Sequence, residues 1–459
     1  MAKYEIKDGV GIIPAGTKKI LSEAFDNCPE LTSVIIPDSV TEIGQYAFYK
    51  CSNLKYVVIP KEVTKIGEGA FEGCKSLTSI DIPDSVTIIR RSAFSDCSNL
   101  ESVTLPAFLT ILEQNLFSKC VSLSHIVIPD AVTIIKDNAF YNSGLTSISF
   151  GKSLKSLGFS AFSGCIGITD LALPDSLETI GQCAFQKCTG LEDVIIPNGV
   201  KSIGPWAFTQ CINLKHVFIS ESVNSFEGGA TVFSECPNLI SIVVADGNKF
   251  LDSRDNCNAI IRTEDDFLLA ACKTTTLPDS IKKIASEAFR GRGDLESIVI
   301  PNSVTHMYSD VFADCSLKSI VIPDSVVVIG GRAFWNNNLK EVVLGKSVET
   351  IAGEAFSGAD ITSLVIPESV KTIGERAFSS CKYLKDVVIL APLNKLCSEA
   401  FRDCVALETV TFPVGIKAID DKVFDNCSSL KAIYVPAKKT EYYKKRLPEA
   451  LHGLIVEKN

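Results

Sequence analysis

The sequence has little of what a membrane span, nucleic-acid binding or catalysis would need. It contains no run of about 18 apolar residues, which excludes a transmembrane helix. Its net charge is −9 and no basic stretch is interleaved with aromatic residues, so phosphate repulsion excludes a nucleic-acid partner. Hydrophobic residues make up 46% of the chain and charged residues 22%, a balance that excludes disorder.

Histidine is scarce, and catalytic motifs are missing. His125 and His216 occupy one position of the repeat described below but lie four repeats apart, roughly 19 Å at the usual strand spacing. His306 and His452 stand at unrelated positions. No nucleophile elbow, zinc-protease motif or phosphate-binding loop occurs. We therefore expect no enzyme activity and no catalytic, metal-binding or cofactor-binding residue.

The first residues lack the charged and then apolar segment of a secretory signal. Two explanations stay open, since either the protein works in the cytoplasm or an export signal has been removed ahead of Met1. We also expect no membrane span.

What the sequence does contain is a repeat marked by phenylalanine. The interval between successive anchors is 22 to 25 residues, with one interruption. The seventeen anchors are Phe25, Phe48, Phe71, Phe94, Phe117, Phe140, Phe162, Phe185, Phe208, Phe233, Phe289, Phe312, Phe334, Phe356, Phe378, Phe401 and Phe424. Such a period is typical of solenoid proteins, in which stacked copies bury a face that one copy cannot bury alone.

One unit, residues 31–51, shows what each position requires. Its first six residues are rich in β-branched side chains and end at Pro37, which cannot donate to a ladder, so we predict a short strand there. The positions of Val34 and Ile36 hold apolar residues in every clear copy, whereas the position of Ile35 also accepts aspartate, serine and threonine. Because strand side chains alternate between faces, the first two point into the core and the third points outward.

The motif Ile-Pro-Asp-Ser-Val-x-x-Ile-Gly-x-x-Ala-Phe-x-x-Cys-x-x-Leu resembles the BspA-like (Treponema-type) leucine-rich repeat of bacteria over roughly residues 10–435. The resemblance implies an α/β-type repeat solenoid with a parallel β-sheet on its concave face and irregular or short helical segments on its convex side. It also implies a bacterial protein, at the cell surface or secreted, that acts in adhesion or protein binding.

We accordingly expect residues 1–435 to form one solenoid of about 17–18 repeats. The interval between Phe233 and Phe289 is 56 residues, and within it residues 258–261 and 267–271 favour a β-hairpin in a long repeat at about 245–277. The polar loop before this hairpin is either an ordinary loop or a cation site. Residues 436–459 are predicted to form a cap made of a short helix and a strand.

Cysteine follows the repeat. Thirteen of the seventeen cysteines stand three residues after an anchor, where other copies place Ser143, Asn337 or Ala359. A position that accepts these residues favours a small buried group over a disulfide or a metal ligand. Many free thiols fit a reducing compartment such as the cytoplasm.

The outward strand position is apolar in most copies, which predicts an exposed ridge on the concave face. The ridge residues are Ile195, Phe218, Val299, Val321, Val343, Val365, Val388 and Tyr434. Contiguous exposed apolar surface is typical of a partner site. The alternative is that β-branched side chains stand there only because they pair well across adjacent strands.

Three functional hypotheses follow. The first is a non-enzymatic scaffold, a monomer, that binds a protein ligand or a glycan through the concave sheet. The second is a structural repeat protein that associates with itself. The third, an enzyme, would need chemistry in the interruption at 245–277.

Overall fold

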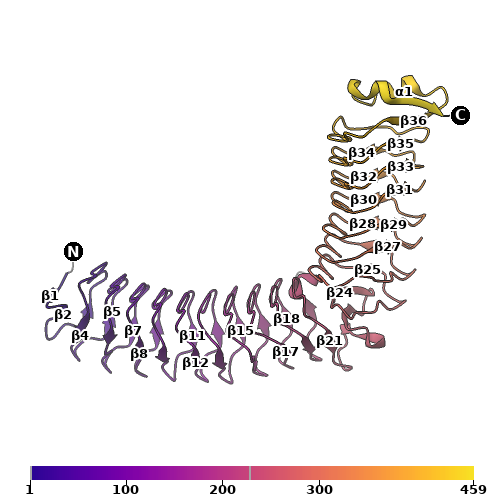
Figure 1. Cartoon of the computed structure of the whole chain (residues 1–459). Coiled ribbons are helices and arrows are strands. Elements are labelled where there is room, and N and C mark those ends of the chain that lie inside the picture. The colour runs from indigo at the N-terminus through magenta and orange to yellow at the C-terminus, as the bar shows by residue number, and fades with distance from the viewer. Residues whose placement is uncertain (1–2, 227–228, 459) are drawn as a thin grey trace. The chain divides into compact units, whose positions relative to one another are not determined.

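A computed structural model describes residues 3–226 and 229–458. The chain forms two compact units, which we call unit 1 (Met1–Gly228 with Val244–Lys249) and unit 2 (Gly229–Val243 with Phe250–Asn459). Each unit is a stack of turns, one turn per repeat (Figure 1). A turn contributes first a long strand, then a two-residue strand, and then the segment that carries the phenylalanine anchor.

In unit 1 an antiparallel hairpin begins the stack, and β2 then pairs in parallel with β4. The hairpin is β1 (Glu5–Lys7) and β2 (Val10–Ile12), and the long strands are β4 (Ser33–Ile35), β6 (Tyr56–Val57), β8 (Ser79–Asp81), β10 (Ser102–Thr104), β12 (His125–Val127), β14 (Ser147–Ser149), β17 (Asp193–Ile196) and β19 (His216–Ile219). They pair in parallel, β4 with β6, β8 with β10, β12 with β14 and β17 with β19.

The two-residue strands of unit 1 form two further parallel sheets, one of four strands and one of six. They are β3 (Lys19–Ile20), β5 (Glu42–Ile43), β7 (Lys65–Ile66), β9 (Ile88–Ile89), β11 (Ile111–Leu112), β13 (Ile134–Ile135), β15 (Ser156–Leu157), β16 (Thr179–Ile180), β18 (Ser202–Ile203) and β20 (Ser225–Phe226). In nine of these strands the second residue is buried, as Ile43 opposite Ile66 shows, whereas Phe226 of β20 is half-buried.

Unit 2 repeats the plan. Its long strands are β21 (Ser241–Val244), whose last residue is counted in unit 1, β27 (Ser319–Val321), β29 (Glu341–Val343), β31 (Ser363–Ile366), β33 (Asp386–Ile389), β35 (Thr409–Thr411) and β36 (Ala432–Pro436). Its two-residue strands are β22 (Leu251–Asp252), β25 (Lys283–Ile284), β26 (His306–Met307), β28 (Val328–Ile329), β30 (Thr350–Ile351), β32 (Thr372–Ile373) and β34 (Lys395–Leu396).

The interruption holds the antiparallel pair β23 (Ala259–Arg262) and β24 (Phe267–Ala271), at the place predicted for a hairpin. β24 pairs in parallel with β25, so the hairpin extends the sheet of two-residue strands. The C-terminal segment consists of α1 (Thr440–Lys444), a 3-10 helix η3 (Glu449–Leu454) and β37 (Ile455–Lys458), which pairs with β36. The buried ring of Tyr443 stacks on Phe412 at 5.1 Å, which closes the end of the core.

The anchor segments are not helical in most turns. Around Phe48, every second backbone N–H donates to the next turn at 2.7 to 2.8 Å, from Tyr46 to Glu68, from Phe48 to Ala70 and from Lys50 to Glu72. Tyr46 and Lys50 both have a left-handed φ of 53°, and left-handed residues stand four apart in the same way around Phe94 and Phe117. An α-helix cannot continue through such residues.

In the described residues the chain is a parallel β-solenoid with few helices. The expected α/β class is not confirmed, and of the irregular or short helical segments expected, most anchor segments are of the irregular kind. The helices besides α1 and η3 are the 3-10 turns η1 (Gly229–Phe233) and η2 (Arg254–Asn256). That the long-strand sheet lines a concave face stays a prediction.

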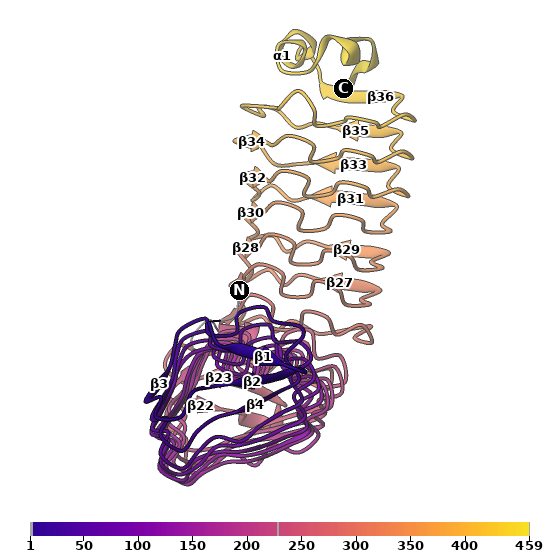
Figure 2. The ribbon, with the colours of Figure 1, turned by 90° about the vertical axis from the view of Figure 1, so that its left-hand side faces the viewer.

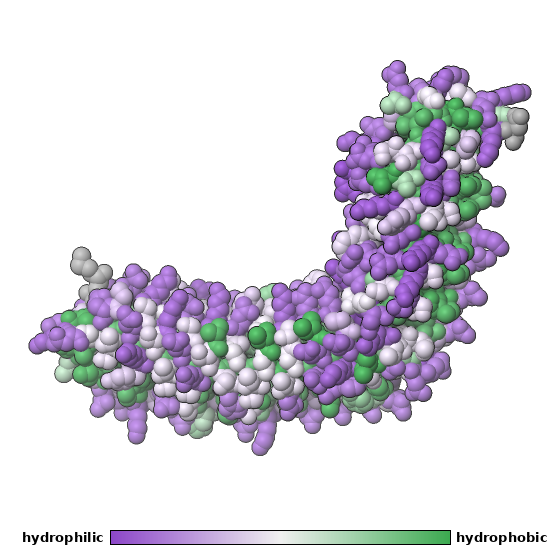
Figure 3. All heavy atoms as spheres, viewed as in Figure 1, coloured by the Kyte–Doolittle hydropathy of each residue, from purple (hydrophilic) through white to green (hydrophobic). Residues whose placement is uncertain are grey.

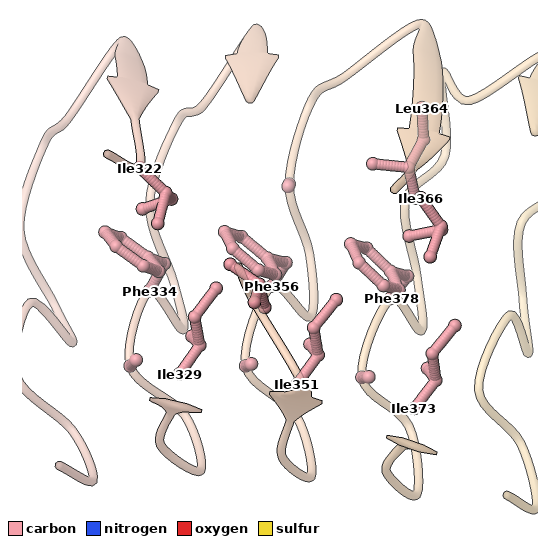
Figure 4. Close-up of a cluster of buried hydrophobic side chains, with 14 of the residues drawn as sticks. Ile322, Ile329, Phe334, Ile351, Phe356, Leu364, Ile366, Ile373 and Phe378 are labelled. Carbon is pink, nitrogen blue, oxygen red and sulfur yellow. The ribbon is translucent and has the colours of Figure 1, made fainter. Parts of the chain in front are cut away.

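The anchors form a ladder of stacked rings inside each unit. From Phe25 to Phe208, successive ring centroids lie 5.0 to 5.6 Å apart with the planes within 19° of parallel. A second ladder runs from Phe289 to Phe424 at 4.9 to 5.8 Å. Figure 4 shows three of its rings flanked by isoleucines from both kinds of strand, and in Figure 2 the turns of unit 1, seen nearly end-on, superimpose.

Candidate functional site

The outward face of the long strands carries a polar and an apolar row of side chains. In β17 the outward residues are Asp193 and Ile195, and in β19 they are His216 and Phe218. Exposed and buried residues alternate along both strands. The repeat therefore places a polar row beside an apolar row on the same surface.

Unit 1 brings two of the predicted ridge residues together. Ile195 and Phe218 are directly opposite in the parallel pair of β17 and β19, with exposed fractions of 64% and 40%. Beside them, Nδ1 of His216 and Oδ1 of Asp193 are joined by a hydrogen bond of 2.6 Å. The apolar pair Ile195 and Phe218 is thus bordered by a hydrogen-bonded polar pair, Asp193 and His216.

Unit 2 brings four of the predicted residues into two pairs. Val321 is opposite Val343, and Val365 is opposite Val388. The first three are exposed, whereas Val388 is half-buried. In Figure 3 hydrophobic residues gather on the side of unit 2 where Figure 1 labels β27, β29 and β31.

The remaining two predicted residues differ from these pairs. Val299 is 84% exposed but lies in a segment to which no strand is assigned. Tyr434 lies in β36 opposite Val456 of β37, and the Lys458 ammonium is 4.4 Å from the centre of its ring. The cap therefore partly covers Tyr434. Because no backbone pairing joins β29 to β31 in the described residues, the ridge is a set of pairs and not one continuous row.

Two hollows accompany the pairs, and the sequence reasoning missed both. In unit 1 a hollow of about 450 Å³ is lined by Ile195 and Phe218 together with Asp170 and Asp175. In unit 2 a hollow of about 680 Å³ lies between β29 and β31 and is lined by residues that include Val343, Val365 and Leu390.

A sequence signal precedes each hollow. Gly151 follows β14 and Gly345 follows β29 in the position where most copies have proline. A Cβ atom at Gly151 would lie 2.3 Å from the carbonyl oxygen of Pro129, and one at Gly345 would lie 2.2 Å from that of Pro323. Only glycine allows the chain to approach the preceding turn so closely.

The groups considered for chemistry are held by ordinary partners. Nδ1 of His125 bonds the Ser147 hydroxyl at 2.8 Å, and the Asp252 carboxylate holds Arg254 in the polar loop before the hairpin. In residues 3–226 and 229–458, no group of three or more histidine, cysteine, aspartate or glutamate side chains is placed to hold a metal ion.

All seventeen cysteines are unbridged, and all but Cys397 and Cys427 are buried. Burial raises the pKa of the Cys315 thiol to about 12 and that of Cys257 to about 11, so both are protonated at neutral pH. Thiolates, not thiols, act as nucleophiles and metal ligands. The fifteen buried cysteines are packing residues of the core.

No helix within the described part of the chain is long and apolar enough to cross a membrane.

Stacked turns, most of them with one long parallel strand, closed on a buried phenylalanine ladder, define a leucine-rich-repeat β-solenoid. The chain belongs to the BspA-type leucine-rich repeat family, because the family described as "BspA type Leucine rich repeat region (6 copies)" matches residues 18–145, 133–259, 264–385 and 350–447. The resemblance inferred from the repeat motif is thereby confirmed.

Solved structures show the same fold. The chain is similar to the pneumococcal vaccine antigen PcpA, with a TM-score of 0.62 and 20% identity over 85% of this chain and 91% of that one. It is also similar to a leucine-rich repeat protein from Eubacterium ventriosum, with a TM-score of 0.56 and 21% identity over 76% of this chain and 89% of that one. No curated protein matches the chain.

Proposed function

We propose that this chain is a non-enzymatic scaffold that binds a protein ligand through the outward face of its long-strand sheets. The observation that carries the proposal is the exposed pair Ile195 and Phe218, set in register beside a hollow in unit 1. An aromatic side chain in a surface hollow is the usual anchor of a protein interface. The Val343 and Val365 hollow of unit 2 supports the same use of its sheet face.

The competing explanation is that β-branched residues stand outward only because they suit strands. Strands also favour aromatic residues, so this explanation accounts for the outward side chains but not for the hollow that Ile195 and Phe218 line. Binding to a glycan or to a second copy of the chain are the alternatives that the experiment has to separate.

The test compares variants of the full chain as bait. Phe218→Ala and Val343→Asp are paired with controls of the same chemistry away from the sheet face, Phe108→Ala and Val121→Asp, whose side chains are 70% and 59% exposed. We expect a captured protein that wild type and both controls retain to be lost or weakened in the two face variants, with melting temperatures nearly unchanged.

Equal capture by all five proteins would contradict the proposal. Light scattering over a range of concentrations addresses self-association, because a mass that rises with concentration would favour the structural repeat protein, whereas the scaffold is expected to stay a monomer.

A further inference from the structure

The hollow of unit 1 lies where the long-strand sheet is interrupted. No long strand is assigned between β14 and β17, where only the two-residue strands β15 and β16 occur, and the Leu173 N–H donates back to the Leu171 carbonyl at 3.2 Å, a tight three-residue turn. In the described structure β14 pairs only with β12. The turn around Leu171 to Leu173 therefore contributes no long strand, and a hollow of about 450 Å³ lies beside it.

The hollow has an apolar wall and an acidic border. Ile195, Phe218 and Leu173 supply the apolar surface, and Asp170, Asp175 and Asp193 bring three carboxyl groups. No lysine or arginine lines it. The only basic group bonded to these carboxylates, among the described residues, is His216 on Asp193.

Asp175 lacks a hydrogen bond that several of its counterparts in other turns accept. At the same position Asp84 accepts the backbone N–H of Ala107 at 2.8 Å, and Asp130 accepts that of Lys152 at 3.0 Å. Neither Asp175 nor Asp170 enters a hydrogen bond or ion pair within the described residues. By contrast, nearby Glu178 is held by two lysines. Two carboxylates thus border an apolar hollow without a cation to neutralise them.

We propose that this hollow receives a lysine or arginine side chain from an extended, basic segment of a partner polypeptide. The inference rests on the proposed function and names the partner's chemistry at one site. Long basic side chains carry an apolar stem and a charged head, so the stem would lie on Ile195 and Phe218 while the head meets Asp170 and Asp175. The Phe218 ring adds an attractive face for the cation.

An extended segment is the form that fits. The hollow follows the strand direction from Asp193 to Asn198, and a strand-like peptide presents alternate side chains to one surface. In a peptide that alternates valine and lysine, all the lysines face one side and can meet the acidic border of the hollow, while the β-branched valines favour the extended form.

The experiment measures fluorescence anisotropy of labelled octapeptides with the full chain. The probes are alternating valine–lysine, valine–glutamate and glycine–lysine peptides. We expect the valine–lysine peptide to bind about tenfold more tightly than either other peptide, and its affinity to fall as salt is added.

The diagnostic variant is the double change Asp170→Asn with Asp175→Asn, which removes charge and keeps shape. Its charge-matched control is Asp38→Asn with Glu62→Gln, two exposed acids of other turns. We expect the diagnostic variant to lose about tenfold in affinity for the valine–lysine peptide, the control to retain it, and both to melt as wild type does.

Equal affinity for the valine–glutamate peptide, equal losses in both double variants, or no binding of any peptide would each overturn the inference. A captured protein that is lost by Phe218→Ala but retained by the Asp170 and Asp175 double variant would also overturn it, and would leave the scaffold proposal in place.

Discussion

The Sγ atom of Cys74 lies 3.1 Å from the carbonyl oxygen of Phe48 in the preceding turn, and the thiol donates to it. The same bond links Cys97 to Phe71, Cys120 to Phe94 and Cys404 to Phe378 at 3.1 to 3.2 Å. Burial raises the pKa of the Cys74 thiol well above its ordinary value, so it stays protonated and able to donate. The cysteine ladder thus satisfies carbonyl groups that lie in the core.

Removing such a thiol donor should lower the free energy of unfolding, and introducing one should raise it. Cys74→Ala is expected to destabilise unit 1 by about 0.5–1.5 kcal/mol, because the Phe48 carbonyl loses the thiol and keeps only the Cys51 backbone N–H at 3.2 Å. Ala359 occupies the same position of the repeat and has no donor. Ala359→Cys is expected to stabilise unit 2 by about 0.5–1.5 kcal/mol.

Both changes are measured by urea denaturation of the reduced protein. A Cys74→Ala variant as stable as wild type would contradict a stabilising role for the thiol.

The phenylalanine ladder should be the most sensitive part of the core. Phe94 is fully buried, with ring centroids 5.4 Å from Phe71 and 5.6 Å from Phe117. Phe94→Ala is expected to cost about 3–5 kcal/mol through lost burial and a cavity. The exposed Phe108→Ala serves as control and should change the unfolding free energy by less than about 0.5 kcal/mol.

Thermal denaturation checks the difference between these two variants. Similar melting temperatures would contradict the assignment of the anchors to a shared core.

Arg292 takes the place of the cysteine after the anchor Phe289 and is almost fully buried. Its Nη2 donates to the carbonyl of Phe233 at 3.0 Å and to that of Ala271, at the end of β24, at 2.9 Å. Burial lowers the pKa of this guanidinium below its ordinary value. The side chain thus ties the hairpin to an earlier anchor.

Arg292→Met keeps an apolar chain and removes both bonds, which should loosen the hairpin locally. Hydrogen exchange is expected to speed up in residues 259–271 and to stay unchanged in residues 363–389. Uniform acceleration across unit 2 would instead indicate global destabilisation.

The ion pairs of Glu178 should make the stability of unit 1 depend on pH. It lies 2.9 Å from both Lys201 and Lys155, and these hydrogen bonds lower its pKa from 4.5 to about 2. A depressed carboxyl pKa contributes stability that is complete above the ordinary value and lost as the pH falls towards the folded value. The difference in unfolding free energy between wild type and Glu178→Gln should therefore shrink between pH 4.5 and about 2.

Denaturation of both proteins across that range provides the measurement, with Glu62→Gln as a control that has no lysine partner among the described residues. A difference independent of pH would rule out the ion pairs as its cause. Added salt should reduce the difference, because the groups are at the surface.

Repeat positions that depend on local chemistry could be predicted from sequence. Pro37 marks the end of a strand, Phe48 the buried anchor and Ile35 an outward position, because strand alternation and solenoid stacking follow from the pattern itself. The left-handed turns at Tyr46 and Lys50 could not be predicted, since neither residue type favours them. Arg292 was missed because its place in the repeat does not suggest a buried charge.

By itself the sequence determined the period, the family and which residues face the core, because these depend on a spacing of residue types that recurs in every repeat. Only the tertiary structure decided which carbonyl each thiol bonds, where the sheet breaks between β14 and β17, and which carboxylates border the resulting hollow. Those features depend on distances between turns, which are set by how neighbouring copies stack and not by the residues of any one copy.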